Sequence, residues 1–159
     1  MHLNKNIFIG IFCILLANSI FGQEKNYFSF EAAGSGGFGS LNYEKPVYSK
    51  SKLTLNFRVG FSFTPIDPSN GTNLIFPIML HSLFGAKDHK LDLAIGQAIT
   101  ITTRASFYIS APLAIGYRYQ PSEKNYFLRL AYTPLISYLL GVQWQNWAGF
   151  TYGYHFNRK

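Results

Sequence analysis

Hydrophobic and polar residues alternate with a period of two along much of the chain. In residues 53–64, Leu, Phe or Val occupies every odd position, and Thr, Asn, Arg, Gly or Ser occupies every even position. The alternation recurs in residues 91–102, where Gln97 interrupts it, and in residues 107–120 and 148–156. Successive side chains of a strand point to opposite faces, so this pattern predicts β-strands with one apolar face and one polar face.

The pattern, together with the turn residues between its segments, predicts eight strands. We expect them over residues 26–33, 37–45, 52–64, 73–85, 90–102, 106–120, 125–137 and 142–156. An even number allows an antiparallel barrel to close with both termini at one end. Two interpretations remain open for residues 26–45, because the glycines at 34, 36, 37 and 39 could either turn the chain between two strands or kink one long strand.

Strand length and the composition of the two faces favour a membrane barrel over a soluble one. The predicted strands reach 15 residues, whereas strands of soluble proteins cluster near about 5–6 and membrane-spanning strands need about 9–11. A lipocalin-like barrel would hold large apolar residues inside and charged residues outside. Here Arg58, Asp92, Arg118 and Arg129 share the face that carries small residues. We therefore predict an all-β fold, an eight-stranded antiparallel transmembrane β-barrel.

This assignment sorts the outward side chains into two groups. The residues expected to face lipid are Leu55, Phe57, Val59, Phe61, Leu93, Ile95, Ile99, Leu113, Ile115 and Phe150. Aromatic residues near strand ends are expected to form the girdles of a membrane barrel. These interfacial residues are Tyr117, Tyr119, Tyr126, Tyr152, Tyr154 and Phe156.

The alternation also predicts a polar, charged lumen. Its expected residues are Glu31, Asn42, Glu44, Asn56, Arg58, Asp92, Arg118, Arg129, Gln143, Gln145 and His155. Eight strands leave an interior just wide enough for side chains, so we expect a filled lumen. Glu44, Asp92, Arg118, Arg129 and His155 lie near strand ends on one side and are expected to meet at one level. Such a network is either structural, pairing its charges, or a proton relay or ligand anchor.

Charge and composition narrow the possible functions. The chain has 14 basic and 7 acidic residues, yet only 13% of its residues are charged, about half the usual fraction. Nucleic-acid binding is not expected, because the basic residues are scattered in connectors instead of clustered on one face. Nine of them fall at or near the end that carries the termini, where anionic lipid would attract them. They are Lys25, Lys45, Lys50, Lys52, Lys87, Lys90, Lys124, Arg158 and Lys159.

The first 22 residues have the features of a cleaved secretory signal peptide, which leaves residues 23–159 as the barrel domain. Lys5 is followed by an apolar run over residues 7–17, and Gln23 would begin the mature chain. The alternative, a transmembrane helix, needs about 20 apolar residues, more than this run contains. Cys13 is the sole cysteine of the sequence and lies inside the apolar run. We therefore expect no disulfide in the mature protein.

Catalytic and ligand-binding motifs do not emerge from the sequence. An enzyme acting on lipid A or phospholipid would need a nucleophile and a base that converge at the outer rim. Ser106 and Ser110 are expected near that rim, whereas His81, His89 and His155 are expected near the opposite end. The sequence has neither a nucleophile-elbow motif nor a zinc-protease motif. We predict no catalytic, cofactor or metal site; the enzyme and a narrow channel remain alternatives.

Four segments are similar to small outer-membrane β-barrel proteins of the Bacteroidota. They are Gly36–Glu44, Gly116–Pro121, Phe127–Leu135 and Trp147–Phe156. The last resembles the aromatic-terminated strand that barrel-assembly machinery recognises, although three residues follow Phe156. The resemblance implies a barrel in the outer membrane of a Gram-negative bacterium, with both termini in the periplasm. Its expected role is structural or interactive, with outer-membrane lipids, the assembly machinery and an unidentified envelope protein as partners.

Overall fold

The computed structural model describes residues 25–67, 71–104, 106–137 and 143–157. The predicted signal peptide lies outside these residues. In the described part of the chain, no helix is long and apolar enough to cross a membrane.

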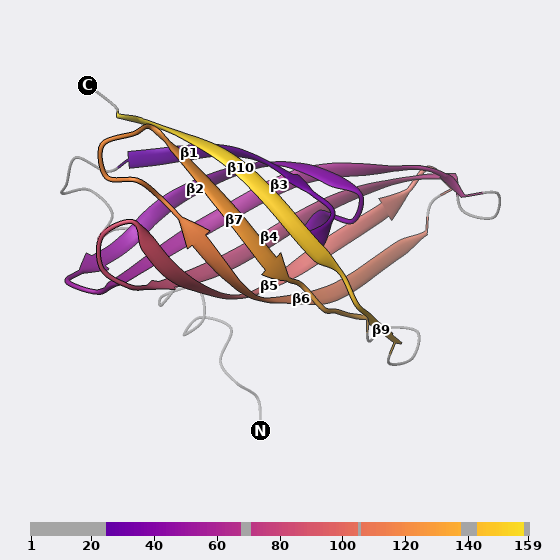
Figure 1. Cartoon of the computed structure of the whole chain (residues 1–159). Coiled ribbons are helices and arrows are strands. Elements are labelled where there is room, and N and C mark those ends of the chain that lie inside the picture. The colour runs from indigo at the N-terminus through magenta and orange to yellow at the C-terminus, as the bar shows by residue number, and fades with distance from the viewer. Residues whose placement is uncertain (1–24, 68–70, 105, 138–142, 158–159) are drawn as a thin grey trace, which may run out of the picture.

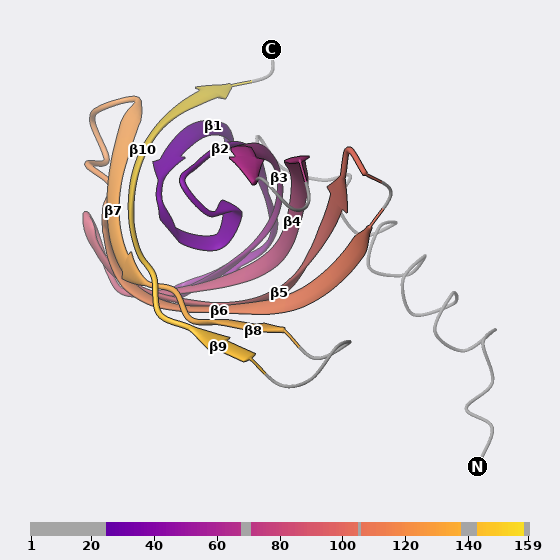
Figure 2. The same cartoon turned by 90° about the vertical axis from the view of Figure 1, so that its right-hand side faces the viewer.

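The described chain is built almost entirely of antiparallel strands that close into a barrel (Figures 1 and 2). The strands are β1 (Lys25–Ala32), β2 (Gly39–Lys50), β3 (Leu53–Asp67), β4 (Gly71–Phe84), β5 (His89–Thr102), β6 (Phe107–Tyr119), β7 (Tyr126–Tyr132), β8 (Leu135–Ser137), β9 (Gln143–Gln145) and β10 (Ala148–Asn157). Sequence neighbours pair from β1 to β6, and β1 pairs with β10, which closes the sheet.

The ten segments correspond to eight barrel strands. β7 and β8 both pair with β6, and the register of Ile115 with Tyr132 continues unchanged to Pro112 with Leu135. β10 and β9 continue one register against β7 and β8 in the same way. The interruption falls at Pro134, which has no N–H to donate to a ladder. The prediction of an eight-stranded antiparallel barrel is thereby confirmed.

We call the end that carries Lys25 and Asn157 the terminal end, and the opposite end the distal end. The connectors from β2 to β3, from β4 to β5 and from β6 to β7 lie at the terminal end. β8 and β9 lie at the distal end (Figure 1). Several strands extend beyond their predicted limits; β2 runs on to Lys50 through an irregularity between Pro46 and Tyr48. Such a bulge accommodates the proline, which cannot donate to the ladder.

The glycine-rich segment resolves into a connector between two strands, because β1 and β2 pair with each other. Ala33–Phe38 forms this connector and contains a 3₁₀ turn, η2 (Gly34–Gly36), whose three residues are buried. Figure 2 looks down the barrel from its distal end and shows the connector curled into the interior. Of the two interpretations left open for residues 26–45, the structure shows two strands, and the connector between them folds inward at the distal end. The glycines allow it because positive φ at Gly34 and Gly37 is open to residues without a side chain.

The two faces of the barrel have opposite polarity. Large apolar side chains are exposed on the outside, among them Phe28, Phe61, Ile95 and Leu130. Buried polar and charged side chains outnumber buried apolar ones in the described chain. This distribution is the reverse of that expected for a lipocalin-like soluble barrel.

Candidate functional site

The described barrel interior contains three carboxylates and three guanidiniums, each ion-paired with an opposite charge, and we call this set the lumen network. Glu31 in β1 joins two arginines, with 2.7 Å from Oε2 to Arg58 Nη2 and 2.9 Å from Oε1 to Arg129 Nη1. Arg58 is on β3 and Arg129 on β7, so one carboxylate links three strands around the barrel. All three side chains are at most 2% exposed.

A second branch of the lumen network is centred on Asp92 in β5. Its Oδ2 lies 2.7 Å from Arg129 Nε, and its Oδ1 lies 2.8 Å from His81 Nδ1. The Asp92 and His81 side chains have no exposed surface. Arg129 therefore connects Glu31 with Asp92, and the branch ends on the imidazole of His81 in β4.

Arg118 and Glu44 form the third part of the lumen network. Arg118 Nη1 donates to Glu44 Oε1 at 2.5 Å, and Asn56 Nδ2 donates to the same oxygen at 2.5 Å. The guanidinium also lies over the Phe127 ring, 3.6 Å from its centroid, and 4.9 Å from that of Tyr27. These cation–π contacts stabilise a charge that has lost its hydration.

The inward connector closes the lumen network on its distal side. Ser35 Oγ donates to Glu31 Oε2 at 2.8 Å. A methyl group at Gly34 would come within 2.7 Å of Glu31 Oε1, and one at Gly149 within 3.1 Å. Backbone and carboxylate therefore approach each other at distances that only glycine permits.

The charges of the lumen network balance. Glu31, Glu44 and Asp92 each have an arginine nitrogen within 2.9 Å. An unpaired charge in such an interior would cost several kcal/mol, whereas mutual pairing with further hydrogen bonds offsets most of that cost. The arrangement explains why ionisable residues can occupy a narrow, closed interior.

Of the eleven residues predicted to face the lumen, nine are buried inside the barrel and Gln143 and Gln145 are exposed, and the structure does not bring all of the charged ones together. Glu31, Glu44, Arg58, Asp92, Arg118 and Arg129 make up the lumen network. His155 is buried but separate: its Nε2 lies 3.0 Å from the carbonyl oxygen of Lys124, and its ring packs edge-on against Tyr27. Within the described chain His155 makes no ion pair with these charges, although its ring and the Arg118 guanidinium both lie against the Tyr27 ring.

Sequence reasoning missed several interior residues. His81, Met79 and Leu83 on β4 are buried, as are Tyr27 and Phe127. β4 has apolar residues on both faces and lacks a clean alternation, so the sequence did not indicate which of its residues face the lumen. In the ladder, Asp92 on β5 lies opposite Leu83 and Ala94 lies opposite His81, so His81 is the inward-facing position diagonal to Asp92. Antiparallel pairing of the predicted strands 73–85 and 90–102 in this register could have suggested the contact.

The predicted outward residues lie on the outer face with graded exposure. Val59, Phe61, Leu93, Ile95, Ile115 and Phe150 are exposed, whereas Leu55, Phe57, Ile99 and Leu113 are half-buried between neighbouring side chains. Among the aromatic residues expected at the interfaces, Tyr117, Tyr152, Tyr154 and Phe156 are exposed, and Tyr119 and Tyr126 are half-buried.

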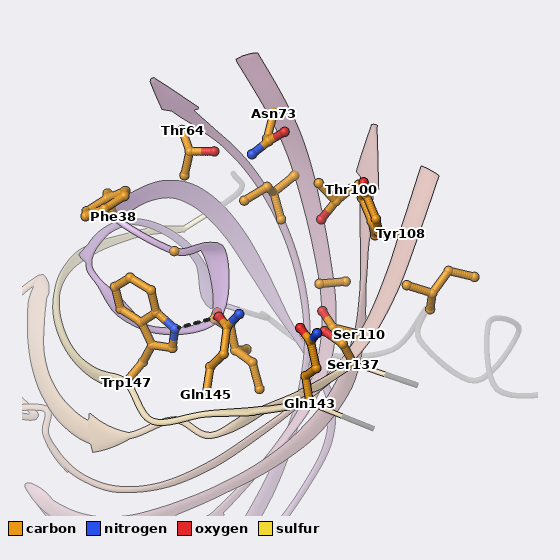
Figure 3. Close-up of a pocket in the computed structure, with 16 residues that line it drawn as sticks. Phe38, Thr64, Asn73, Thr100, Tyr108, Ser110, Ser137, Gln143, Gln145 and Trp147 are labelled. Atoms are coloured by element: carbon orange, nitrogen blue, oxygen red, sulfur yellow. Dashed lines mark hydrogen bonds between the residues drawn. The ribbon is translucent and has the colours of Figure 1, made fainter. Parts of the chain in front are cut away.

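A cavity of about 340 Å³ opens on the distal side of the inward connector (Figure 3). We call it the distal cavity. Its lining comes from the connector and from β3, β4, β5, β6, β8 and β9, together with Trp147. Gln143 and Gln145, expected inside the lumen, instead lie exposed at this mouth. They extend the wall of the cavity and do not join the lumen network.

The remaining histidine of the described chain lies apart from the lumen network. His89 is at the terminal end, where Nδ1 contacts the Tyr117 hydroxyl. Within the described residues, no three His, Cys, Asp or Glu side chains come together as metal ligands would.

Comparison with models of known protein families finds no match, and comparison with curated proteins finds no significant similarity.

Proposed function

We propose that this chain is an integral outer-membrane β-barrel protein of a Gram-negative bacterium, with a structural or interactive role in the cell envelope. The observation that carries the proposal is the polarity of the barrel: exposed apolar side chains outside, and paired charges inside. A bilayer stabilises this distribution, because its hydrocarbon solvates the apolar outer face. A closed sheet also pairs its backbone N–H and C=O groups by hydrogen bonds. In this proposal the first 22 residues are a signal peptide, and the chain is a member of the small Bacteroidota barrel proteins it resembles.

The basic connectors support an orientation with both termini in the periplasm. Lys50, Lys52, Lys87 and Lys124 lie in or beside connectors at the terminal end. Anionic phospholipid attracts such residues by about 1 kcal/mol each near the surface. The periplasmic leaflet would provide this lipid, and the barrel-assembly machinery would insert the chain from the same side.

The filled interior supports a scaffold in preference to a channel. The lumen network joins β1, β3, β5 and β7 by ion pairs across the barrel. The inward connector lies against the same network through Ser35. We therefore expect no stepwise ion conductance from the purified protein in planar bilayers. Discrete conductance steps would favour the channel.

The positions of the histidines support a role other than lipid hydrolysis or acyl transfer. His81 pairs with Asp92 inside the barrel, and His89 and His155 lie at the terminal end. Ser110, by contrast, lines the distal cavity. Release of fatty acid from phospholipid or lipid A by the purified barrel would favour the enzyme instead.

Fractionation of the native cell envelope tests the proposed location directly. We expect the protein in the outer-membrane fraction, and we expect unboiled samples to migrate differently from boiled samples in a denaturing gel. Recovery in the soluble periplasmic fraction would contradict the proposal. The gel shift alone tests the barrel, so the two readouts separate an error in location from an error in fold.

A further inference from the structure

We propose that the distal cavity is a binding site for a neutral saccharide, such as the end of a short oligosaccharide. The proposal goes beyond a structural role and requires only the barrel fold, so it does not depend on which membrane holds the protein. It rests on the polarity, the aromatic wall and the unused hydrogen-bonding groups of the cavity.

The chemistry of the lining selects a neutral, hydroxyl-rich ligand. Among the described residues that line the distal cavity, none carries a formal charge. Anionic ligands are usually bound through arginine or lysine, and no such residue contributes here. The polar lining comprises hydroxyl and amide side chains: Ser35, Thr64, Asn73, Thr100, Tyr108, Ser110, Ser137, Gln143 and Gln145. Hydroxyl and amide groups both donate and accept hydrogen bonds, as sugar hydroxyls do.

An aromatic wall lies on one side of the cavity. Trp147 and Phe38 meet edge to face, with ring centroids 5.6 Å apart and planes at 86°. Figure 3 shows both rings on one side and Thr100, Tyr108, Ser110 and Ser137 on the other. A pyranose ring has an apolar C–H face and a polar rim, so it can stack on an aromatic ring while its hydroxyls reach polar groups opposite.

Two polar atoms of residues that line the distal cavity have no hydrogen-bond partner within the described chain. Thr64 Oγ1 and Asn73 Oδ1 are both buried and make no hydrogen bond within the described chain. Unpaired buried polar atoms are rare in folded proteins and call for an explanation. Gln145 makes only a long contact, 3.4 Å, with the Trp147 indole N–H. Because the Thr64 and Asn73 oxygens are closed to solvent, a polyhydroxylated ligand would use their hydrogen-bonding capacity after these side chains turn toward the cavity.

The size and floor of the cavity fit a small ligand. Its volume of about 340 Å³ lies at the lower end of the range of about 300–1,000 Å³ for ligand pockets. The connector forms the floor through Ser35 and Gly37, and it contributes Phe38 to the aromatic wall. A side chain at Gly37 would extend toward Thr64 and Ile75, and the positive φ of this residue disfavours one. Gly37 therefore leaves the floor of the cavity without a protruding side chain.

Tryptophan fluorescence offers a direct binding assay. The full chain has two tryptophans, and Trp144→Phe would leave Trp147 as the reporter. The barrel should be folded in a phosphocholine detergent, because sugar-based detergents would compete. Maltotriose, cellotriose, mannotriose and chitotriose would serve as probes. We expect saturable changes in Trp147 emission with at least one of them, confirmed by titration calorimetry on the unsubstituted chain.

Substitutions of polar residues that line the distal cavity test where the saccharide binds. Asn73→Leu and Gln145→Leu should each raise the dissociation constant about tenfold or more, since each removes a hydrogen bond to the ligand. Asn125→Leu, an amide change at the terminal end, should leave it unchanged. Gln145 is exposed on β9, so its variant should fold even if Asn73→Leu does not, and gel migration of unboiled samples checks folding.

Three results would overturn the proposal. The first is the absence of saturable binding by all four trisaccharides up to their solubility. The second is binding with equal affinity in the folded wall variants and the unsubstituted chain. The third is tighter binding of a sulfated trisaccharide than of its neutral parent, which would mean that the cavity selects anions.

Discussion

Glu31 illustrates how one side chain organises the interior of this barrel. Its two carboxylate oxygens contact Arg58, Arg129 and Ser35, which belong to three different parts of the chain. The methyl group of an alanine at Gly34 or Gly149 would crowd the same carboxylate. Removal of the Glu31 charge would leave the guanidiniums of Arg58 and Arg129 with less negative charge beside them, in an interior that water does not reach.

Neutralising Glu31 should therefore be costly. We expect Glu31→Gln to lower the free energy of unfolding by about 3–5 kcal/mol, because it breaks a buried ion pair from one side. Urea titration of the barrel in phospholipid vesicles, followed by tryptophan fluorescence, measures the change. The matched control is Glu123→Gln in the exposed connector from β6 to β7, expected to fall within about 0.5 kcal/mol of the unsubstituted protein. Equal effects of the two substitutions would contradict the assigned role of Glu31.

Ile95 tests the assignment of the outer face, as Glu31 tests the interior. Its side chain is 61% exposed and lies in the middle of β5. We expect Ile95→Arg to reduce stability in vesicles by about 2–4 kcal/mol, since a charge at mid-depth meets hydrocarbon. Ile95→Leu keeps the side chain apolar and should change little. In a protein surrounded by water, the arginine would instead be nearly neutral in its effect, and that outcome in vesicles would refute the facing assignment.

At the scale of elements, the strands were predictable and the inward connector was not. The alternation in β3 and β5 fixes which residues face inward, because a shift of one residue would reverse both faces. Residues 33–38 carry no such periodic signal, since small residues suit an outward turn and an inward fold equally. Their direction depends on the hydrogen bond from Ser35 to nearby Glu31 and on packing against residues distant in the sequence, such as Ser62. His81 was missed for a related reason: β4 is apolar on both faces.

Gly36 tests whether the connector is seated as described. A methyl group there would lie 2.6 Å from Ser40 Cβ and 3.2 Å from Ser62 Cβ. We expect Gly36→Ala to destabilise the barrel by about 1–3 kcal/mol through overpacking. Ser40→Gly, added to the same chain, should recover part of the loss. Additive effects in this double-mutant cycle would mean that the two residues do not touch.

The connectors at the terminal end are joined by hydrogen bonds to Asp88. Its carboxylate accepts from the Ser122 hydroxyl at 2.8 Å and from the Ser122 backbone N–H at 2.9 Å. These bonds hold the pKa of Asp88 below its ordinary value. These hydrogen bonds therefore stabilise the folded protein above the ordinary pKa of about 3.9. Their stabilisation is lost as the pH falls through the lower pKa that Asp88 has in the folded state.

Carbon NMR titration of the Asp88 carboxyl measures this effect. We expect Ser122→Ala to raise the pKa of Asp88 toward the ordinary value, because the hydroxyl donor is lost while the backbone donor remains. Ser137→Ala at the distal end should leave that pKa unchanged. An unaltered titration of Asp88 in Ser122→Ala would show that the two connectors are not joined in this way.

For the molecule as a whole, the proposed membrane location requires hydrocarbon around the apolar outer face. The barrel closes through the pairing of β1 with β10, so neither strand leaves a free edge over its paired residues. The sequence predicted this architecture because strand length, period and strand number all agree. It predicted neither the distal cavity nor individual ion pairs of the lumen network such as Glu31 with Arg129 and Glu44 with Arg118, because these pairs join strands that are not neighbours in the sheet.

The most direct measurement is the environment of a spin label on the outer face. In a Cys13→Ala background, Ile95→Cys and Ser122→Cys provide one label at mid-strand and one in an exposed connector. In phospholipid vesicles, we expect the label at residue 95 to collide with oxygen far more than with a water-soluble nickel chelate, and the label at residue 122 to do the opposite. Ready collision of the residue-95 label with the nickel chelate would contradict the account.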